Sequence, residues 1–425
     1  MSRGFNKSLL ALSVTGLLIS PLANATNGYF AHGYSTKEKA LAGAGVAHSQ
    51  DAMAAANNPA GLVNVGDRMD VGAAIFNPNR GYTVTGAPSA VVGTFGLTPG
   101  SVDSAQEYFF IPHFGYSKKL DDTSAFGVAA YGNGGMNTNY KSSAAPAGTF
   151  YGGPTGVNLA QLFINASYAK QLNSDHSVGA SLIFAYQMFK SSGLAAFGGF
   201  SADNTKLTNN GDDTSTGFGA KIGWQGKVAP EVTLGASYQT KMSMSEFDDY
   251  AGLFAEQGDF DIPATLSLGA AWDIDDKRTL VVDVQTIYYS DVASIANPMS
   301  KLLVDGQPFG AANGPGFGWE DMTVVKIGYE WDQNDMTWRV GLSNGSQPIP
   351  ESEVMFNMLA PGIMETHLTF GFTMAMGSNA EFSLAGMYAP SNDVTGANPM
   401  EVPNQQTIKL EMDQMEVQAT YSMKF

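Results

Sequence analysis

The chain has 425 residues, with 22 Lys and Arg against 39 Asp and Glu, a formal net charge of −17. This acidity argues against a nucleic-acid partner, because such partners select basic surfaces. The absence of cysteine excludes both a disulfide framework and a thiolate metal site. Charged residues make up only 14% of the chain, against roughly 25% in soluble domains, which favours a membrane-embedded class.

The first 25 residues have the pattern of a cleaved export signal. Arg3 and Lys7 supply the positive start, residues 9–19 form a short apolar core, and Ala23-Asn24-Ala25 matches the A-x-A cleavage site. This apolar run is too short to span a membrane, and no later stretch is long and apolar enough. We therefore predict a signal peptide over residues 1–25 and an exported protein.

The segment 26–64 differs from everything after it. It is rich in Gly and Ala and has no sustained period of two or 3.6 residues. Small residues bury little side-chain volume but let backbone pack closely against backbone. This composition suits a compact plug, called the hatch below, that turns into the first strand at Asn58-Pro59-Ala60. A flexible N-terminal linker fits the composition equally well.

From residue 65 onward the chain consists of runs of about 10–14 residues with strand character, the length that crosses a membrane at a tilt. Short polar spacers alternate with long ones. The short spacers lie at 120–123, 172–175, 229–231, 274–277, 332–335 and 376–379. The long ones lie near 80–105, 136–157, 191–216, 244–262, 293–319, 346–364 and 390–408. Six tight turns and seven long loops predict fourteen strands with both ends on the same side.

The strands alternate between apolar and polar residues. In the last one, apolar residues from Val417 to Phe425 alternate with polar residues from Glu416 to Lys424, which indicates one apolar and one wet environment. A soluble sandwich would also alternate, but the export signal and the terminal aromatic favour a barrel. We predict an all-β fold: a 14-stranded antiparallel transmembrane β-barrel over residues 65–425 of a bacterial outer membrane, with the hatch in its lumen.

These features resemble the FadL/TodX/OmpP1 family of outer-membrane transporters of hydrophobic compounds. The most specific pieces are the hatch, the loop Met244–Pro263, the tripeptide Pro348-Ile349-Pro350 and the run His367–Phe372. The resemblance covers the whole mature chain. It implies capture of long-chain fatty acids or other hydrophobic molecules by extracellular loops, followed by sideways exit through a gap in the barrel wall. It further implies a monomer in contact with membrane lipid and lipopolysaccharide, with neither energy source nor cofactor.

A hydrophobic cargo needs an apolar landing site above the membrane, and two long loops offer one. If the loop Met244–Asp261 is helical, four of its apolar side chains share one face: Phe247, Tyr250, Leu253 and Phe254. The loop 191–216 adds Leu194, Phe197 and Phe200. Loops at these places form a low-affinity groove in the family. The alternative is a helix merely packed on the barrel rim.

A sideways exit needs a strand that stops pairing. Gly132-Asn133-Gly134-Gly135 follows the strand at 126–131, and glycines inside a strand mark a bulge or a kink. The resemblance places the wall gap at this strand, whereas an ordinary strand end is the alternative. It also gives functional weight to Asn58-Pro59-Ala60, which we interpret as the hatch hinge rather than a plain turn. By the same resemblance, Tyr29 and Phe30 reach the lumenal pocket.

A fatty-acid carboxylate in a dry pocket needs a cationic or hydrogen-bonding partner. Family members place two basic side chains around the pocket, from the fifth strand and the start of the tenth. Here only Lys190 and Lys326 stand near those places, and Lys190 has the parity of the outer face. This departure leaves neutral hydrocarbons, including aromatic ones of the toluene type, open as cargo.

Catalytic patterns are absent from the sequence. The five histidines form no H-E-x-x-H motif, and there is neither a G-x-S-x-G motif nor a P-loop. The acidic run 209–213 indicates a solvated loop rather than a Ca²⁺ site. We predict a transporter and not an enzyme, without cofactor or metal. An outer-membrane lipid hydrolase and a general porin are the alternatives from other classes.

Overall fold

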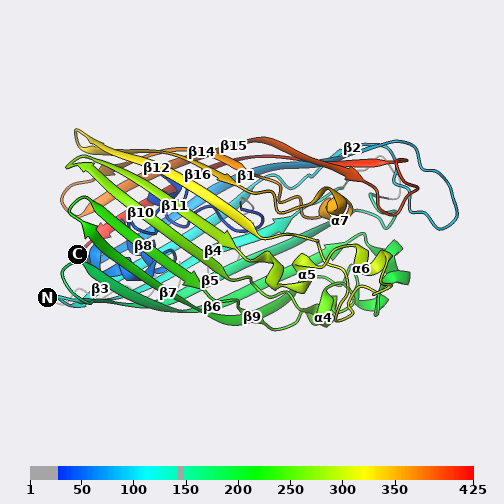
Figure 1. Ribbon diagram of the computed structural model, residues 1–425, viewed down its shortest axis with the longest axis horizontal. Helices are drawn as coiled ribbons and strands as arrows, with labels where there is room; N and C mark the ends of the chain where they lie inside the picture. The colour runs from blue at the N-terminus through cyan, green and yellow to red at the C-terminus, as the bar shows by residue number, and fades with distance from the viewer. Residues whose placement is uncertain (1–26, 142–147) are drawn as a thin grey trace.

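The computed structural model describes residues 27–141 and 148–425. The signal peptide predicted for residues 1–25 lies outside this part of the chain. Fourteen antiparallel strands form one sheet, which closes because β1 (Arg68–Thr85) pairs with β16 (Thr407–Lys424). The predicted 14-stranded barrel is confirmed (Figure 1). The other wall strands are β3 (Phe109–Asp121), β4 (Ser124–Asn137), β5 (Gly156–Gln171), β6 (His176–Ser192), β7 (Asp213–Ala229), β8 (Val232–Gln239), β10 (Thr265–Asp275), β11 (Arg278–Ile287), β12 (Met322–Gln333), β13 (Met336–Gly345), β14 (Thr366–Ala375) and β15 (Ala380–Ala397).

Tight turns and long connections lie at opposite ends of the barrel, which we call the turn end and the loop end. All six predicted tight turns join strands where the spacers predicted them. Two long loops were predicted too long, because β1 continues to Thr85, β15 to Ala397, and β16 starts at Thr407. These three strands stay paired with one another beyond the rest of the wall. The polar residues in this part, which the sequence analysis assigned to loops, are therefore part of the strands.

Short elements decorate the loop end (Figure 1). They are β2 (Gly100–Asp103), η3 (Ala195–Phe200), η4 (Asn204–Lys206), β9 (Ser243–Met244), η5 (Asp248–Tyr250), α4 (Ala255–Gly258), η6 (Tyr289–Asp291), α5 (Ala293–Ala296), α6 (Ser300–Leu303), η7 (Glu351–Glu353) and α7 (Val354–Asn357). Within the described residues, no helix has the length and apolar character needed to cross a membrane.

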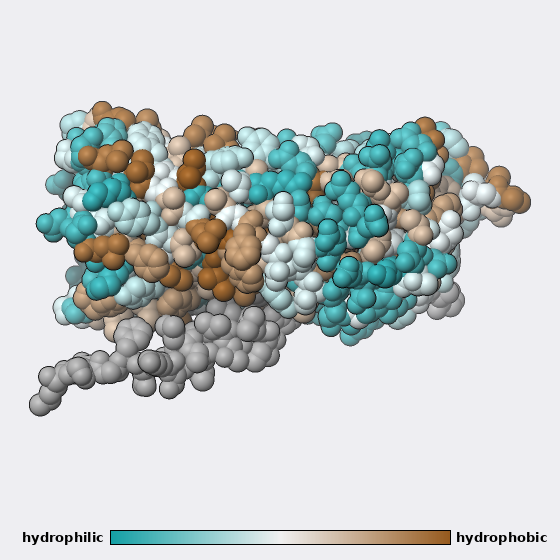
Figure 2. Space-filling model, turned by 90° about the horizontal axis from the view of Figure 1, so that it is seen from below, coloured by the Kyte–Doolittle hydropathy of each residue, from teal (hydrophilic) through white to brown (hydrophobic). Residues whose placement is uncertain are grey.

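The alternation predicted for the strands separates an apolar outside from a polar inside. In β12, Val325 and Ile327 are exposed while Lys326 between them is buried. In β14, Leu368 and Phe370 are exposed while His367 is buried. Figure 2 shows apolar residues gathered over the wall and mostly hydrophilic ones over the loop end. The wall therefore presents apolar side chains to the surroundings and polar ones to the lumen.

The hatch fills the lumen (Figure 1, dark blue). It consists of short pieces: α2 (Thr36–Ala40), η1 (Ala52–Ala55), η2 (Pro59–Gly61) and α3 (Leu62–Val65). The first three begin at side-chain caps, where Ser35, Asp51 and Asn58 accept hydrogen bonds from backbone N–H groups of the next turn. Most of its residues are buried. The many Gly and Ala residues, which give the segment no regular hydrophobic period, allow this compact packing.

The hatch touches the wall backbone to backbone. Gly179 of β6 pairs with Gly223 of β7, and the tripeptide Asn58-Pro59-Ala60 lies against both. A Cβ on Gly179 would lie 2.5 Å from the nitrogen of Ala60, and one on Gly223 would lie 2.0 Å from the Asn58 side-chain oxygen. Any larger residue at either position would therefore push the hatch away from the wall.

We predict that Gly179→Val loosens the hatch without unfolding the barrel. The added side chain meets hatch backbone that cannot move aside, and such overpacking costs about 1–3 kcal/mol. Ion conductance in planar bilayers should rise above the wild-type level. Gly386→Ala in β15 is the matched control, because its Cβ would meet no atom closer than 4.0 Å. Equal conductance of Gly179→Val and wild type would contradict the close fit.

Candidate functional site

Four segments of the loop end enclose an apolar cavity with about 30 Å³ of free space. They belong to the connections that follow β6, β8, β11 and β13, and the rim of the wall closes the cavity from below. Its aromatic and aliphatic lining comprises Val157, Phe189, Leu194, Phe197, Leu207, Leu253, Phe254, Phe309, Phe317, Phe356 and Leu359. We call this the upper cavity. In this closed form it holds little more than one water molecule.

The structure brings together most of the residues predicted for a loop groove. Leu194, Phe197, Leu253 and Phe254 line the upper cavity. Phe247 and Tyr250 are buried behind it, with ring centroids 5.6 and 4.8 Å from that of Phe189. Phe200, by contrast, is 40% exposed and does not line the cavity. The two predicted loops therefore do share one apolar surface.

The segment Met244–Asp261 is not one continuous helix, so the condition under which its apolar side chains would share a helical face is not met. The segment breaks into a short strand and two single turns, with Glu256 and Gln257 in the left-handed region at φ +56° and +63°. Their N–H groups donate to the carbonyls of Ala311 and Gly310 at 3.1 Å each. Contacts with a neighbouring loop thus hold a strained conformation that the local sequence would not adopt alone.

Several residues of the upper cavity were missed from the sequence. Phe189 directly precedes Lys190, the residue that the sequence analysis selected at this place because of its charge. Phe309, Phe317 and Phe356 come from two other loops. The signal was there: these loops carry large apolar residues in segments otherwise rich in Gly, Pro and polar residues. Their convergence depends on the barrel, which places the loops side by side.

A second, lower cavity of about 10 Å³ lies next to the upper one. Leu359 and Phe317 line the upper cavity, and Ala360 and Trp319 line the lower. The remaining lining residues are Gly28, Phe76, Arg80, Gly135, Met136, Asn137, Pro361, Gly362 and Met412. The first described residues of the hatch therefore form part of its wall.

Tyr29 and Phe30 are buried beside the lower cavity. Their ring centroids lie 5.1 Å apart, and the Tyr29 ring lies 5.4 Å from Tyr289 and 6.0 Å from Trp319. The Tyr289 hydroxyl donates to the carbonyl of Asn27 and accepts from the N–H of Tyr29 at 3.2 Å. An aromatic cluster thus clamps the start of the hatch below the loops.

The barrel wall is interrupted beside this cluster. β3 and β4 pair only as far as His113 and Tyr131, and Asn133 then forms a bulge against β5. Beyond this point the inner side of β4 pairs with the hatch: Gly135 donates to Tyr29, and Ala31 donates to Asn133, at 3.0 and 2.8 Å.

Gly134 is required by this arrangement. A Cβ at Gly134 would lie 1.8 Å from the carbonyl oxygen of Tyr29. The glycines predicted to break a ladder, Gly132, Gly134 and Gly135, thus stand where the pairing of β4 with β3 is lost. On the lumenal side of β4, the hatch backbone takes the place of the missing strand partner.

The two lysines predicted for a carboxylate site lie elsewhere. Lys190 is exposed on the outer face of β6, opposite in parity to the buried Phe189, so the structure does not support a pocket role. Lys326 is buried, and its ammonium group donates to the carbonyls of His32 and Gly43 at 3.2 and 3.3 Å. Lys326 therefore contacts the hatch backbone and lines neither the upper nor the lower cavity.

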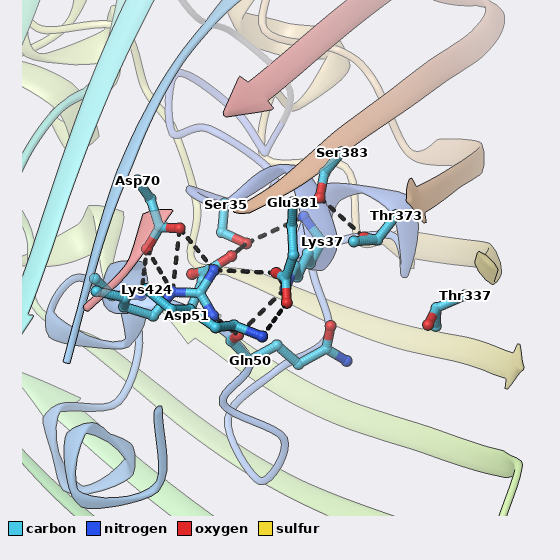
Figure 3. Close-up of polar contacts among 12 residues, drawn as sticks. Ser35, Lys37, Gln50, Asp51, Asp70, Thr337, Thr373, Glu381, Ser383 and Lys424 are labelled. Atoms are coloured by element: carbon cyan, nitrogen blue, oxygen red, sulfur yellow. Dashed lines mark hydrogen bonds and ion pairs between the residues drawn. The ribbon is translucent and has the colours of Figure 1, made fainter. Parts of the chain in front are cut away.

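The turn-end side of the hatch is fastened by ion pairs (Figure 3). Lys37 of α2 lies 2.8 Å from Glu381 of β15, which also pairs with Arg68 and Lys424. Ser35 donates to Asp51 at 2.7 Å within the hatch. Buried ion pairs of this kind are costly to break, because each partner would be left as an unpaired buried charge. The network thus resists displacement of α2.

Asn58 anchors the end of the hatch. Its side-chain amide donates to the carbonyls of Val46 and Trp224 at 2.7 and 3.0 Å, and its side-chain oxygen accepts from the N–H of Ala60 at 3.1 Å. In this state Asn58-Pro59-Ala60 is a fixed contact between hatch and wall. Its role as a hinge stays a prediction.

A closed barrel with an apolar outer wall, a plugged lumen and apolar cavities at its loop end defines the class of outer-membrane transport barrels. The family model "Outer membrane protein transport protein (OMPP1/FadL/TodX)" matches residues 16–420, and the chain belongs to this family. The protein therefore resides in the outer membrane of a Gram-negative bacterium. No curated protein matches the sequence.

Solved structures share the fold at low sequence identity. The Pseudomonas putida toluene transporter TodX is 18% identical, with a TM-score of 0.66, over 94% of this chain and 100% of that one. A Pseudomonas aeruginosa FadL homologue is 14% identical, with a TM-score of 0.67, over 94% and 100%. The Ralstonia pickettii toluene transporter TbuX is 18% identical, with a TM-score of 0.63, over 93% and 99%.

One acidic pair borders the upper cavity. Asp261 forms an ion pair with Lys241 at 2.9 Å, and the carbonyl of Asp259 accepts a hydrogen bond at 2.5 Å from Ser294, which lines the cavity. Burial, reinforced by the charges of Asp261 and Glu256, raises the pKa of Asp259 to about 7. The closed loop therefore holds the Asp259 proton more tightly than an open loop would.

We predict that the loop 254–262 opens more readily as the pH rises. The raised pKa of Asp259 means that the closed loop binds more protons between the ordinary carboxyl pKa and about 7, so its stability falls across that window. Hydrogen exchange of this segment, taken as the ratio of wild type to Asp259→Asn at each pH, should increase from pH 5 to pH 8. The ratio cancels the intrinsic pH dependence of exchange, and a flat ratio would contradict the prediction.

Proposed function

We propose that the protein carries long-chain fatty acids or similar hydrophobic compounds passively across the outer membrane. The cargo enters the upper cavity from the loops and moves to the lower cavity. It displaces the first residues of the hatch and leaves sideways where β4 stops pairing with β3. The observation that carries the proposal is the place of the lower cavity: it lies next to the apolar upper cavity and is lined by Gly135, Met136 and Asn137 of β4, where pairing with β3 has ended.

The chemistry of the lumen favours a sideways exit over passage along the barrel axis. Below Tyr29 and Phe30, the hatch and wall meet through ion pairs, among them those of the buried Lys37 and Arg68 with the half-buried Glu381. An apolar molecule moving through this layer would break ion pairs without replacing them. Exit into the bilayer keeps the cargo in apolar surroundings throughout, so no energy source is needed.

Transport requires motion of the closed state. Cavities with about 30 and 10 Å³ of free space are smaller than the roughly 150 Å³ that holds a benzene ring. The four loops are joined by hydrogen bonds at the loop end, such as those from Glu256 and Gln257, and by side-chain packing around the upper cavity. We infer that cargo binding separates the loops first and moves the hatch start second. A hinge at Asn58-Pro59-Ala60 would serve larger hatch motions.

A second candidate cargo is an aromatic hydrocarbon of the toluene type. Aromatic rings dominate the upper cavity, including Phe189, Phe197, Phe254, Phe309 and Phe356, and two of the structural neighbours are named as toluene transporters. Ring stacking suits such a cargo as well as it suits an alkyl chain. The choice between the two depends on whether the pocket engages a head group.

Uptake of radiolabelled oleate and toluene by a transporter-null Gram-negative strain tests the function. Cells expressing the protein should take up at least one of them faster than vector controls. We predict that Phe197→Ala with Phe254→Ala lowers the initial rate about a hundredfold or more, because each ring buries apolar surface worth about 1.5–3 kcal/mol and about 1.4 kcal/mol corresponds to a factor of ten. Phe200→Ala is the matched control, since Phe200 is exposed and outside the cavity. Uptake of neither compound by wild type would refute the proposal.

Deletion of Asn133 tests the sideways exit. Asn133 is the extra residue of the bulge, and its side chain donates to Gln161 at 2.9 Å and accepts from Tyr34 at 3.0 Å. Without it, β4 can continue its ladder past Gly132, and we predict that uptake falls to the vector level while the barrel still folds. Heat-modifiable migration in detergent gels checks folding. Unchanged uptake in a folded deletion variant would exclude this exit.

A further inference from the structure

Trp319 is a buried side chain at the boundary between the two cavities. It lines the lower cavity, and Phe317, two residues before it, lines the upper one. A Cβ on Gly28 would lie 2.8 Å from the ring carbon Cζ3 of Trp319, and a Cβ on Gly362 would lie 2.7 Å from its Cη2. The six-membered ring of the indole therefore fits against the start of the hatch only because both neighbours are glycine.

The nitrogen of the same indole is held by Asn357. Trp319 Nε1 donates to the side-chain oxygen of Asn357 at 2.6 Å. The side-chain nitrogen of Asn357 donates to the carbonyls of Phe317 and Glu353 at 2.7 and 2.8 Å. Trp319 belongs to the connection after β11 and Asn357 to the connection after β13. One buried amide thus ties these two connections together at the level of the indole.

A cargo molecule in the upper cavity lies between these two connections. Each of them lines both cavities: Phe317 and Phe356 line the upper one, and Trp319 and Ala360 line the lower one. The upper cavity has about 30 Å³ of free space, so cargo enters only when its lining residues move apart. Because the Asn357 amide bridges the two connections, their separation pulls on its bonds to Phe317 and Trp319.

We propose that Trp319 couples the loops to the hatch: cargo in the upper cavity separates Asn357 from Trp319, and the released indole frees Gly28. This inference rests on the proposed transport function and deepens it, because it names the residues that pass the entry of cargo on to the hatch. Trp319 acts as a positioning residue in this step.

The aromatic cluster around Trp319 explains why its release loosens the hatch. The Trp319 ring centroid lies 5.0 Å from that of Tyr289, at an interplanar angle of 88°, and 6.0 Å from that of Tyr29. The Tyr289 hydroxyl in turn holds the backbone of Asn27 and Tyr29. Movement of the indole therefore removes packing from the side chains that clamp the first described residues of the hatch.

The hydrogen bond between Trp319 and Asn357 makes this coupling switch-like. A buried donor or acceptor without a partner is costly, so the indole N–H leaves Asn357 only when another partner replaces it. Separation of the two connections admits water to both groups. The closed loops therefore keep the indole against Gly28, and the opened loops allow it to leave.

Hydrogen exchange of the purified full-length protein in lipid nanodiscs tests the coupling. Oleate and toluene serve as separate probes, and equilibrium dialysis measures how much of each is bound. The readout is the exchange rate of the amides of Tyr29, Phe30 and Ala31 with probe, divided by the rate without probe. All three amides donate hydrogen bonds in the closed state. In wild type a bound probe should raise this ratio about tenfold, within the range typical of coupling between sites.

Two substitutions remove the hydrogen bond without changing the lining of the upper cavity: Trp319→Phe and Asn357→Ala. Each should still bind the probe but lower the ratio to about one, the value without coupling. Without probe, the double variant should exchange no faster than the faster single variant, because both substitutions break the same link. None of these changes lies in residues 27–31, so the intrinsic exchange rates stay equal.

Tyr140→Phe is the matched control. The buried Tyr140 hydroxyl donates to the carbonyl of Met358 at 2.7 Å, directly after Asn357, and Tyr140 lines neither cavity. This variant loses a buried hydrogen bond to the same connection but keeps the bond between Trp319 and Asn357. Its ratio should equal that of wild type.

The outcomes separate the coupling from the transport function. A ratio that stays at the wild-type value in Trp319→Phe and Asn357→Ala would overturn the coupling. Additive effects of the two substitutions without probe would indicate independent structural roles and would also overturn it. A wild-type ratio of one with bound probe would overturn the coupling, while uptake in cells would still support transport. Coupled exchange without uptake in cells would leave the role of Trp319 standing and refute the transport function, and binding of neither probe would overturn both.

Discussion

The pairing of β1 with β16 is the constraint on which the rest of the structure depends. In a bilayer every backbone N–H and C=O group needs a partner, and a sheet meets this demand only when it closes. Closure along the whole of β1, from Arg68 to Thr85, creates a lumen, which the hatch occupies. The hatch fills it with small residues, because only these let its backbone approach the glycines of β6 and β7.

The hatch meets the wall through two chemically different layers. Toward the turn end, the buried cations Lys37 and Arg68 pair with the half-buried carboxylate of Glu381. Toward the loop end, Tyr29 and Phe30 pack among aromatic rings. The first layer opposes an apolar solute and the second accommodates one. The boundary between them lies beside the interruption of β4, so the chemistry of the lumen and the defect in the wall favour the same route.

The loop end combines order with stored strain. Two consecutive residues with positive φ, Glu256 and Gln257, are held by hydrogen bonds to a neighbouring loop. Such conformations persist only while the surroundings hold them. The upper cavity is correspondingly closed, and the aromatic rings that line it contact one another where a cargo would bind. In the proposed transport route, opening would exchange contacts between these rings for contacts with cargo.

The sequence by itself determined the number of strands, the positions of all six tight turns and the face that each strand presents, because these follow from local periodicity and turn chemistry. It also predicted that Phe197 and Phe254 belong to one apolar surface of two loops, and that the glycines around Asn133 lie where a ladder is broken; their roles in transport stay predictions. It did not identify Phe309 or Phe356, and it placed Lys190 among the candidates for the pocket. Only the tertiary structure decided which loops meet and that Met244–Asp261 forms no continuous helix. Those outcomes depend on contacts between residues far apart in the chain, which no local pattern records.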